Sequence, residues 1–393
     1  MASELFSSIE FEMTLFMLIT ILAYYLSYKL SQSALVLQIV LGIIIGPSVL
    51  HLVSGTDFIE SIAQFGAIIL LFVIGLEFRL EDIAKPKYFL IAIFGVLLPW
   101  GGGYLLAKAF GYAFGPALFI GAALTATSIA LTANVLKEMG IIRSEIAKAI
   151  IGAAVIDDVL GLLVLAFSEQ LVGGNVHLSL ILWIFLKAMI FLIGGALLGM
   201  YFFNPIIHKI DKSPVAKKYP ELVFITTMFL VFLYSLVSEY FGLSAIVGAF
   251  LAGVSLEGVQ LINSQSHRHG AEYLHMVFGS IFFVSLGVIV DFHGFSFGTF
   301  FFMIVLTLLA IATKCIGCGV CALFQGYSFQ ESLVLGIGMS PRGEVAMIVA
   351  LLGLNAGIIG QDVYLSLMLM SIITTVAVPP ILRQLLQRSA RLS

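Results

Sequence analysis

The 393 residues are 61% hydrophobic and only 10% charged, with a formal net charge of −3. A soluble domain of average composition has about a quarter charged residues, so these values exclude a water-soluble globular chain and a separate aqueous domain. The near-neutral charge gives no support to nucleic acid as a partner. We therefore expect an all-α, polytopic membrane protein with the lipid bilayer as its main solvent.

Apolar runs long enough to cross about 30 Å of hydrocarbon predict thirteen transmembrane helices in a single membrane domain over residues 1–393. In the first half of the chain they cover residues 11–30, 33–53, 60–78, 88–110, 115–136, 146–168 and 178–203. In the second half they cover residues 221–241, 243–257, 272–291, 296–323, 329–354 and 363–386.

The distribution of Lys and Arg predicts the orientation of these helices. Basic residues collect in or beside five alternate loops and near the C-terminus, as the positive-inside rule requires of cytoplasmic segments. They are Lys29, Arg79, Lys85, Lys87, Lys137, Arg143, Lys209, Lys212, Lys217, Lys218, Arg268, Arg383, Arg388 and Arg391. The loops between them contain no Lys or Arg. We expect a multi-pass protein of the inner (plasma) membrane, with its N-terminus outside and its C-terminus in the cytoplasm.

The order of the helices is compatible with two inverted repeats. The first six and the last six begin on opposite sides of the membrane, and the seventh joins them. The fifth helix of each set has a sequence that favours interruption. Residues 115–136 contain the polar run Thr125–Ser128, and residues 329–354 contain Pro341 among several glycines. Since transporters of this architecture bind their substrates near discontinuous helices, these two segments point to the site.

Ionisable side chains deep in hydrocarbon require a partner or a function. Asp157 and Asp158 lie in the middle of residues 146–168, and Lys314 lies deep in residues 296–323. Consecutive helical residues point about 100° apart, so we expect one aspartate to pair with Lys314 and the other to face a water-filled cavity as a cation ligand. The hydroxyls of Thr127 and Ser128 are candidates to complete a shell of hard oxygen ligands around Na⁺. Adjacent carboxylates resist being ionised together, so one can carry either a proton or a metal cation.

Arg342 and Glu344 stand two residues apart in the predicted break, where a structural role and a functional role are equally compatible with the sequence. Lys187 is expected to extend its ammonium toward the membrane surface. The histidines at 267 and 269 fit a solvated loop better than a pH sensor.

Three cysteines, Cys315, Cys318 and Cys321, share one helical face in residues 296–323. We interpret them as small packing residues and not as ligands of a metal cluster. Gly66 and Gly75 are likewise expected to permit close helix packing. No cofactor, covalent chemistry or enzymatic activity is indicated.

Several motifs together resemble the bacterial sodium/proton antiporters of the second monovalent cation:proton antiporter family, including the Kef- and Nap-type membrane domains. The motifs are Leu41–Pro47 (LGIIIGP), Leu70–Glu77 (LLFVIGLE), Val155–Asp158 (VIDD) and Gly242–Gly253 (GLSAIVGAFLAG). The resemblance implies two crossed discontinuous helices. It implies that Asp158 carries Na⁺ and protons, and that Asp157 pairs with Lys314 and is a secondary Na⁺ ligand.

The resemblance also implies that Thr127 and Ser128 lie beside the crossing and that Arg342 and Glu344 form a charged pair near it. It further implies a homodimer. The core would contain residues 60–168 and 272–386, the dimerisation helices residues 11–53 and 221–257, and the linking helix residues 178–203. The Asp-Asp pair resembles that of electrogenic members of the family.

We therefore expect a secondary active antiporter that exchanges cytoplasmic Na⁺ for external H⁺ by alternating access. A K⁺/H⁺ antiporter of the same family remains open, as does transport of Li⁺, because carboxylate and hydroxyl oxygens suit all these ions. A channel or an organic-anion symporter on a similar fold is less favoured, because acidic groups predominate at the predicted site.

Overall fold

The computed structural model describes residues 8–30, 33–53, 57–83, 85–174, 177–256, 270–289 and 297–390, and within these ranges every regular element is a helix. Among the described residues, eight helical runs are long and apolar enough to cross a membrane. Each of the other five predicted segments contains an apolar helix of 10–17 residues. The thirteen predicted segments thus all coincide with helices, and the predicted fold class is confirmed.

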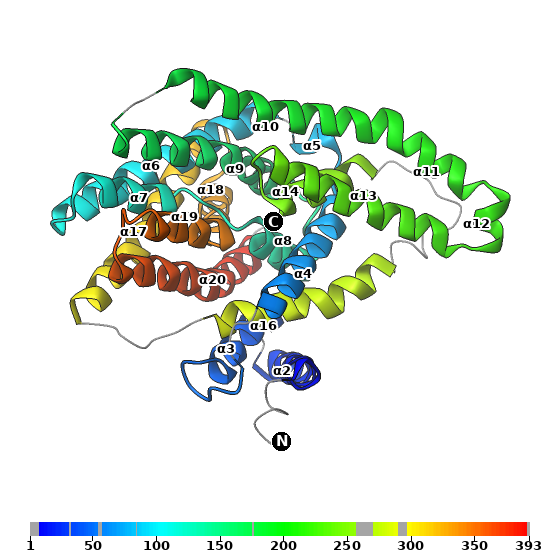
Figure 1. The fold of residues 1–393 in the computed structure, drawn as a ribbon, viewed down its shortest axis with the longest axis horizontal. Helices are drawn as coiled ribbons and strands as arrows, with labels where there is room; N and C mark the ends of the chain where they lie inside the picture. Colours follow the sequence, from blue (N-terminus) through cyan, green and yellow to red (C-terminus); the bar gives the residue numbers. More distant parts are fainter. Residues whose placement is uncertain are drawn as a thin grey trace. The chain divides into compact units, whose positions relative to one another are not determined.

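The chain forms two compact units. Figure 1 labels many of their helices. Unit 1 contains Met1–Asp82 and Leu186–Ile289, and unit 2 contains Ile83–Phe185 and Val290–Ser393. The helices of unit 1 are α2 (Ile9–Leu30), α3 (Ala34–Ile45), α4 (Asp57–Gly75), α11 (Asn204–Asp211), α12 (Pro214–Lys218), α13 (Glu221–Tyr240), α14 (Ala245–Leu256) and α16 (Ser280–Val288), with two π-helical turns, η1 (Gly199–Phe203) and η2 (His275–Gly279). Two elements run across the boundaries between the units, α5 (Leu80–Ile83) and α10 (Leu178–Leu198).

Unit 2 contains the two interrupted segments. Its helices are α6 (Pro86–Ala109), α7 (Phe114–Ala123), α8 (Ile129–Glu138), α9 (Glu145–Val172), α17 (Phe297–Phe324), α18 (Phe329–Gly338), α19 (Glu344–Asn355) and α20 (Gln361–Ala390). The predicted segment 115–136 is split into α7 and α8, and the predicted segment 329–354 into α18 and α19. Both breaks fall where the polar run and Pro341 predicted them.

The packing inside each unit has an internal symmetry. In unit 2, α6 contacts α7 and α9 in the first half, and α17 contacts α18 and α20 in the second half. In unit 1, α3 packs against α16, and α4 packs against α14. In each of these two contacts, the second helix of one repeat lies against the third helix of the other repeat. Equivalent helices of the two repeats are seven membrane crossings apart along the chain. Because seven is an odd number, they cross the membrane in opposite directions, and the two repeats are inverted relative to each other.

Glycines mark the equivalent crossings of unit 1. A Cβ atom on Gly42 would overlap the carbonyl oxygen of Val284 and lie 3.1 Å from the Cα of Gly287. At the related crossing, a Cβ atom on Gly75 would overlap the carbonyl oxygen of Phe250 and lie 3.0 Å from the Cα of Gly253. Helices in lipid gain little from hydrophobic burial against one another, so this close backbone approach supplies much of their packing energy.

Substitution of Gly42 by Ala should lower the free energy of unfolding by about 1–3 kcal/mol, because the methyl group meets backbone atoms that cannot rotate away. The measurement is the thermal unfolding of the detergent-solubilised protein. Gly194→Ala in α10 is the matched control, because nothing lies within 4 Å of its added methyl group. Equal melting temperatures for the two variants would contradict the close approach.

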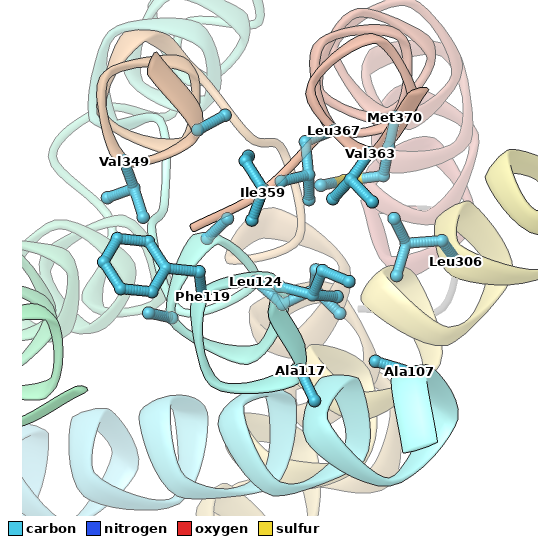
Figure 2. Close-up of a cluster of buried hydrophobic side chains, with 14 of the residues drawn as sticks. Ala107, Ala117, Phe119, Leu124, Leu306, Val349, Ile359, Val363, Leu367 and Met370 are labelled. Carbon is cyan, nitrogen blue, oxygen red and sulfur yellow. The ribbon is translucent and has the colours of Figure 1, made fainter. Parts of the chain in front are cut away.

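A buried apolar core holds the halves of the broken helices in unit 2. Figure 2 shows Phe119 of α7 pointing toward Val349 of α19, with Leu367 and Met370 of α20 in the same cluster. Leu124, which follows α7, is also fully buried in this cluster. The core therefore holds α7 against α19 and α20.

The contacts group two helices differently from the predicted division into core and dimerisation helices. Predicted segments 60–78 and 272–291 were assigned to the core, yet α4 and α16 pack in unit 1 with α3 and α14. The Gly42–Gly287 and Gly75–Gly253 crossings account for this grouping. Which helices move together during transport stays a prediction.

Candidate ion-binding site

The two breaks cross each other in unit 2. Residues 124–128 separate α7 from α8, and residues 339–343 separate α18 from α19. The backbone N–H of Ser128 donates to the carbonyl oxygen of Pro341 at 2.8 Å. The hydroxyl of Thr127 donates to the carbonyl oxygen of Met339 at 3.3 Å, and that of Thr132 donates to the carbonyl oxygen of Gly338 at 2.6 Å. Each break thus satisfies backbone groups of the other, as lipid requires of non-helical backbone.

Arg342 supplies further donors at the crossing. Its guanidinium donates to the carbonyl oxygens of Leu124, of Ala126 at 2.6 Å and of Ala310 at 2.9 Å. The first two carbonyls follow the C-terminus of α7, where the helix dipole favours a positive charge. The side chain is fully buried. Arg342 therefore joins the first break to the second break and to α17.

Two threonines of α20 hold the backbone of Arg342. Its N–H donates to the hydroxyl of Thr374 at 3.1 Å, and the hydroxyl of Thr375 donates to its carbonyl oxygen at 2.7 Å. Sequence reasoning missed both residues. The available signal was an adjacent pair of hydroxyl residues inside an apolar segment, where each needs a hydrogen-bond partner.

Asp157 and Lys314 form an ion pair between α9 and α17. The ammonium of Lys314 lies 2.6 Å from Oδ1 of Asp157, and both side chains are completely shielded from solvent. A charge taken out of water without a partner is very costly, so the two residues depend on each other. The structure brings together the aspartate and the lysine that the resemblance paired.

Asp158 is half-buried on α9 beside this pair. The neighbouring Gly161, one helical turn further, faces the first break: a Cβ atom there would lie 3.4 Å from the hydroxyl oxygen of Thr125. On the other side of the break, the Ala310 carbonyl that binds Arg342 lies one turn before Lys314. The aspartates and Lys314 are therefore each about one turn from the crossing.

The two hydroxyl residues predicted as cation ligands have different surroundings. Thr127 is half-buried, and Ser128 is buried with its hydroxyl oxygen directed at Gly343 of the other break. Glu344 is the first residue of α19, but its side chain is outside the described part of the structure. The charged pair of Arg342 and Glu344 stays a prediction.

The remaining candidates are Lys187, the two histidines and the cysteines. Lys187 is half-buried in α10, and the histidines at 267 and 269 belong to a segment that the structure does not describe. The backbone of Cys315 packs against Gly336, and Sγ of Cys318 lies 3.7 Å from the carbonyl oxygen of Ile91. Both cysteines thus take part in helix packing.

The family described as "Sodium/hydrogen exchanger, transmembrane" matches residues 16–387. The chain belongs to this family. It is 32% identical to the Na⁺/H⁺-K⁺ antiporter GerN of Bacillus cereus, covering 95% of each chain. It is also 32% identical to the high-affinity Na⁺/H⁺ antiporter NhaS3 of Synechocystis, covering 90% of this chain and 77% of that protein. The predicted family of sodium/proton antiporters is thus confirmed.

The fold is similar to that of the sodium proton antiporter MjNhaP1 from Methanocaldococcus jannaschii. One structure of that protein superposes with a TM-score of 0.73 at 18% sequence identity, covering 95% of this chain and 94% of the other. A likeness at this identity concerns the fold alone. As a member of the sodium/hydrogen exchanger family, the chain is a multi-pass membrane transporter.

Proposed function

We propose that this protein exchanges Na⁺ for H⁺ across the membrane, with Asp158 as the group that binds either ion. The observation that carries the proposal is the placement of the half-buried Asp158 beside the fully buried Asp157–Lys314 pair, about one turn from two crossed helix breaks. The relatives GerN and NhaS3 are named as Na⁺/H⁺ antiporters, which supports the same exchange here.

The exchange follows from charge. A carboxylate in a medium of low dielectric constant must be neutralised by a proton or by a cation. Asp158, with the hydroxyl of Thr127 and with Asp157 as a secondary ligand, would offer Na⁺ the hard oxygen atoms that it prefers. Because binding one ion displaces the other, a cycle of alternating access couples the two flows. The second carboxylate, Asp157, provides a further protonation site and supports an electrogenic exchange.

The wider arrangement completes the proposal. The protein would work as a homodimer through residues 11–53 and 221–257, in the plasma membrane, with its N-terminus outside. The inward proton gradient would then drive Na⁺ out of the cytoplasm. The alternation of loops with and without Lys and Arg supports this orientation.

Potassium is the second candidate substrate. The printed name of GerN includes K⁺ as well as Na⁺, and carboxylate and hydroxyl oxygens bind both ions. If K⁺ but not Na⁺ drives proton flux, the protein is a K⁺/H⁺ antiporter.

The substitution Asp158→Asn should abolish cation-driven proton flux, because the amide neither carries a proton nor neutralises a cation. The protein is reconstituted in liposomes with an internal pH dye, and Na⁺, K⁺ or Li⁺ is added in turn. We expect the variant to behave like protein-free liposomes. Glu169→Gln, the same chemical change at an exposed position of the same helix, should keep wild-type flux. Flux retained in Asp158→Asn would refute the assignment.

A further inference from the structure

The helical run that begins with α10 is too long to lie wholly within the hydrocarbon of a membrane. It extends from Leu178 to Asp211, 34 residues in all, which is about 51 Å at 1.5 Å per residue. The hydrocarbon is about 30 Å thick, and even a tilt of about 40°, at the upper end for transmembrane helices, leaves roughly 9 Å outside it. Apart from Lys187, the residues of this run with formal charge at pH 7 all lie in α11. α11 is therefore the end that reaches the headgroup layer.

α11 and α12 form the turn that leads to α13 (Figure 1). Both short helices contact α13, and Ile207, Asp211 and Ala216 are buried there. The hydroxyl of Ser213 accepts a hydrogen bond from the N–H of Ala216 at 3.1 Å, which fixes the start of α12. The exposed positions of this turn include four lysines, here called the lysine face: Lys209, Lys212, Lys217 and Lys218.

The lysine face has positive charge without a counter-charge beside it. Within the part of the chain that the structure describes, none of its four lysines forms an ion pair. By contrast, Lys85 and Lys148 both pair with Glu145, at 3.0 Å and 3.1 Å. Asp211 is the single acidic residue in the sequence from 199 to 220, and it is buried. A ligand of the lysine face should therefore be an anion.

Exposed apolar and aromatic side chains flank the four lysines. They are Tyr201, Phe202, Ile206, Val215 and Tyr219. The ammonium of Lys218 lies over the ring of Tyr219, 5.3 Å from its centroid. Apolar side chains beside lysines suit the boundary between headgroups and acyl chains, where aromatic rings collect. An anionic phospholipid matches both properties, because its headgroup is negative and its acyl chains are apolar.

We propose that the lysine face of α11 and α12 is a docking surface for anionic phospholipids. The lysines bind the headgroup phosphates, and the flanking aromatic and aliphatic side chains contact the acyl chains. In the proposed orientation of the protein, these lipids belong to the cytoplasmic leaflet. Lysines at the C-terminal ends of two short helices also suit the helix dipoles, a role that requires no lipid and that the experiment separates from docking. The docking surface goes beyond the proposed ion exchange and does not involve Asp158.

The test is the thermal unfolding of the full chain in a neutral detergent, titrated with phosphatidylglycerol or with phosphatidylcholine of the same acyl chains. Each lysine near an anionic lipid surface contributes a factor of about five to affinity. Wild type should therefore reach half-maximal stabilisation at a phosphatidylglycerol concentration about tenfold or more below that of phosphatidylcholine. The variant with Lys209→Gln, Lys212→Gln, Lys217→Gln and Lys218→Gln should need about tenfold or more phosphatidylglycerol than wild type.

Three controls make this result specific. Replacing the same four lysines by Arg keeps the charge and should keep the preference for phosphatidylglycerol. Lys29→Gln, at an exposed position near the end of α2, removes a lysine outside the lysine face and should leave the preference unchanged. Glycerol phosphate has the phosphate but no acyl chains, and it should not stabilise wild type at the concentrations at which phosphatidylglycerol does.

Equal stabilisation of wild type by the two lipids would overturn the proposal, as would an unchanged preference in the variant with four Gln substitutions. Equal stabilisation by glycerol phosphate would assign the lysine face to a soluble phosphate ligand instead. If the variant with four substitutions does not fold, Lys217→Gln with Lys218→Gln decides: about fivefold weaker phosphatidylglycerol binding supports docking, and unchanged binding refutes it. Asp158→Asn should keep the lipid preference, so failure of the proposed exchange and failure of the docking surface are separate results.

Discussion

Replacing Arg342 by Gln should lower the melting temperature by roughly 10 °C or more and abolish exchange. The guanidinium serves three backbone carbonyls in a region without access to water. Each buried carbonyl left without a donor costs about 1–3 kcal/mol, and each kcal/mol lowers the melting temperature of a domain of 150–250 residues by roughly 2–4 °C. Exchange should be lost because both breaks are then free to change shape.

Two variants make this result specific. Arg383→Gln removes an arginine from a half-buried position near the end of α20 and should leave the melting temperature within about 2 °C of wild type. Arg342→Lys keeps the charge but cannot serve three carbonyls in the geometry of a guanidinium, so it should fall between wild type and Arg342→Gln. A stable, active Arg342→Gln protein would show that the breaks do not depend on these hydrogen bonds.

The sequence predicts the helices well because each one reflects a single local cause. A span must be apolar over about twenty residues, and hydropathy alone therefore locates all thirteen segments. The breaks are also local. Pro341 lacks the N–H that a continuous helix needs, and the structure ends α18 at Gly338 and starts α19 at Glu344.

The partners of Arg342 lie beyond such local reasoning. Leu124 and Ala126 precede it by more than 200 residues, and what they offer are backbone carbonyls, which every residue has. These two carbonyls come within hydrogen-bonding distance of Arg342 only because the two breaks cross.

The grouping of helices into compact units is a separate property that local sequence features do not determine. Hydropathy and charge give α4 and α16 the same features as their neighbours, so the resemblance alone placed them in the core. Their packing depends on glycines that face particular backbone carbonyls, such as Gly66 against that of Phe278. Spacing in the sequence indicates that such glycines permit a close approach, but not which helix makes it.

Replacing both members of the Asp157–Lys314 pair should destabilise the protein less than replacing either one alone. Lys314→Gln should destabilise the protein by about 3–5 kcal/mol, because it leaves the Asp157 carboxylate fully buried without its ammonium partner. Asp157→Asn should have a similar effect, with the ammonium left alone. The double variant, Asp157→Asn with Lys314→Gln, places two neutral amides opposite each other and should regain most of the lost stability.

Thermal unfolding of the four proteins and the pH profile of their exchange check this prediction together. In Lys314→Gln we expect a shifted pH profile with some exchange surviving, since Asp158 still binds the transported ion in the proposed mechanism. Stability losses that simply add in the double variant would mean that the 2.6 Å contact contributes little to folding. The pair would then affect exchange through its charges near Asp158 and would not affect stability, so its role would be seen in the pH profile alone.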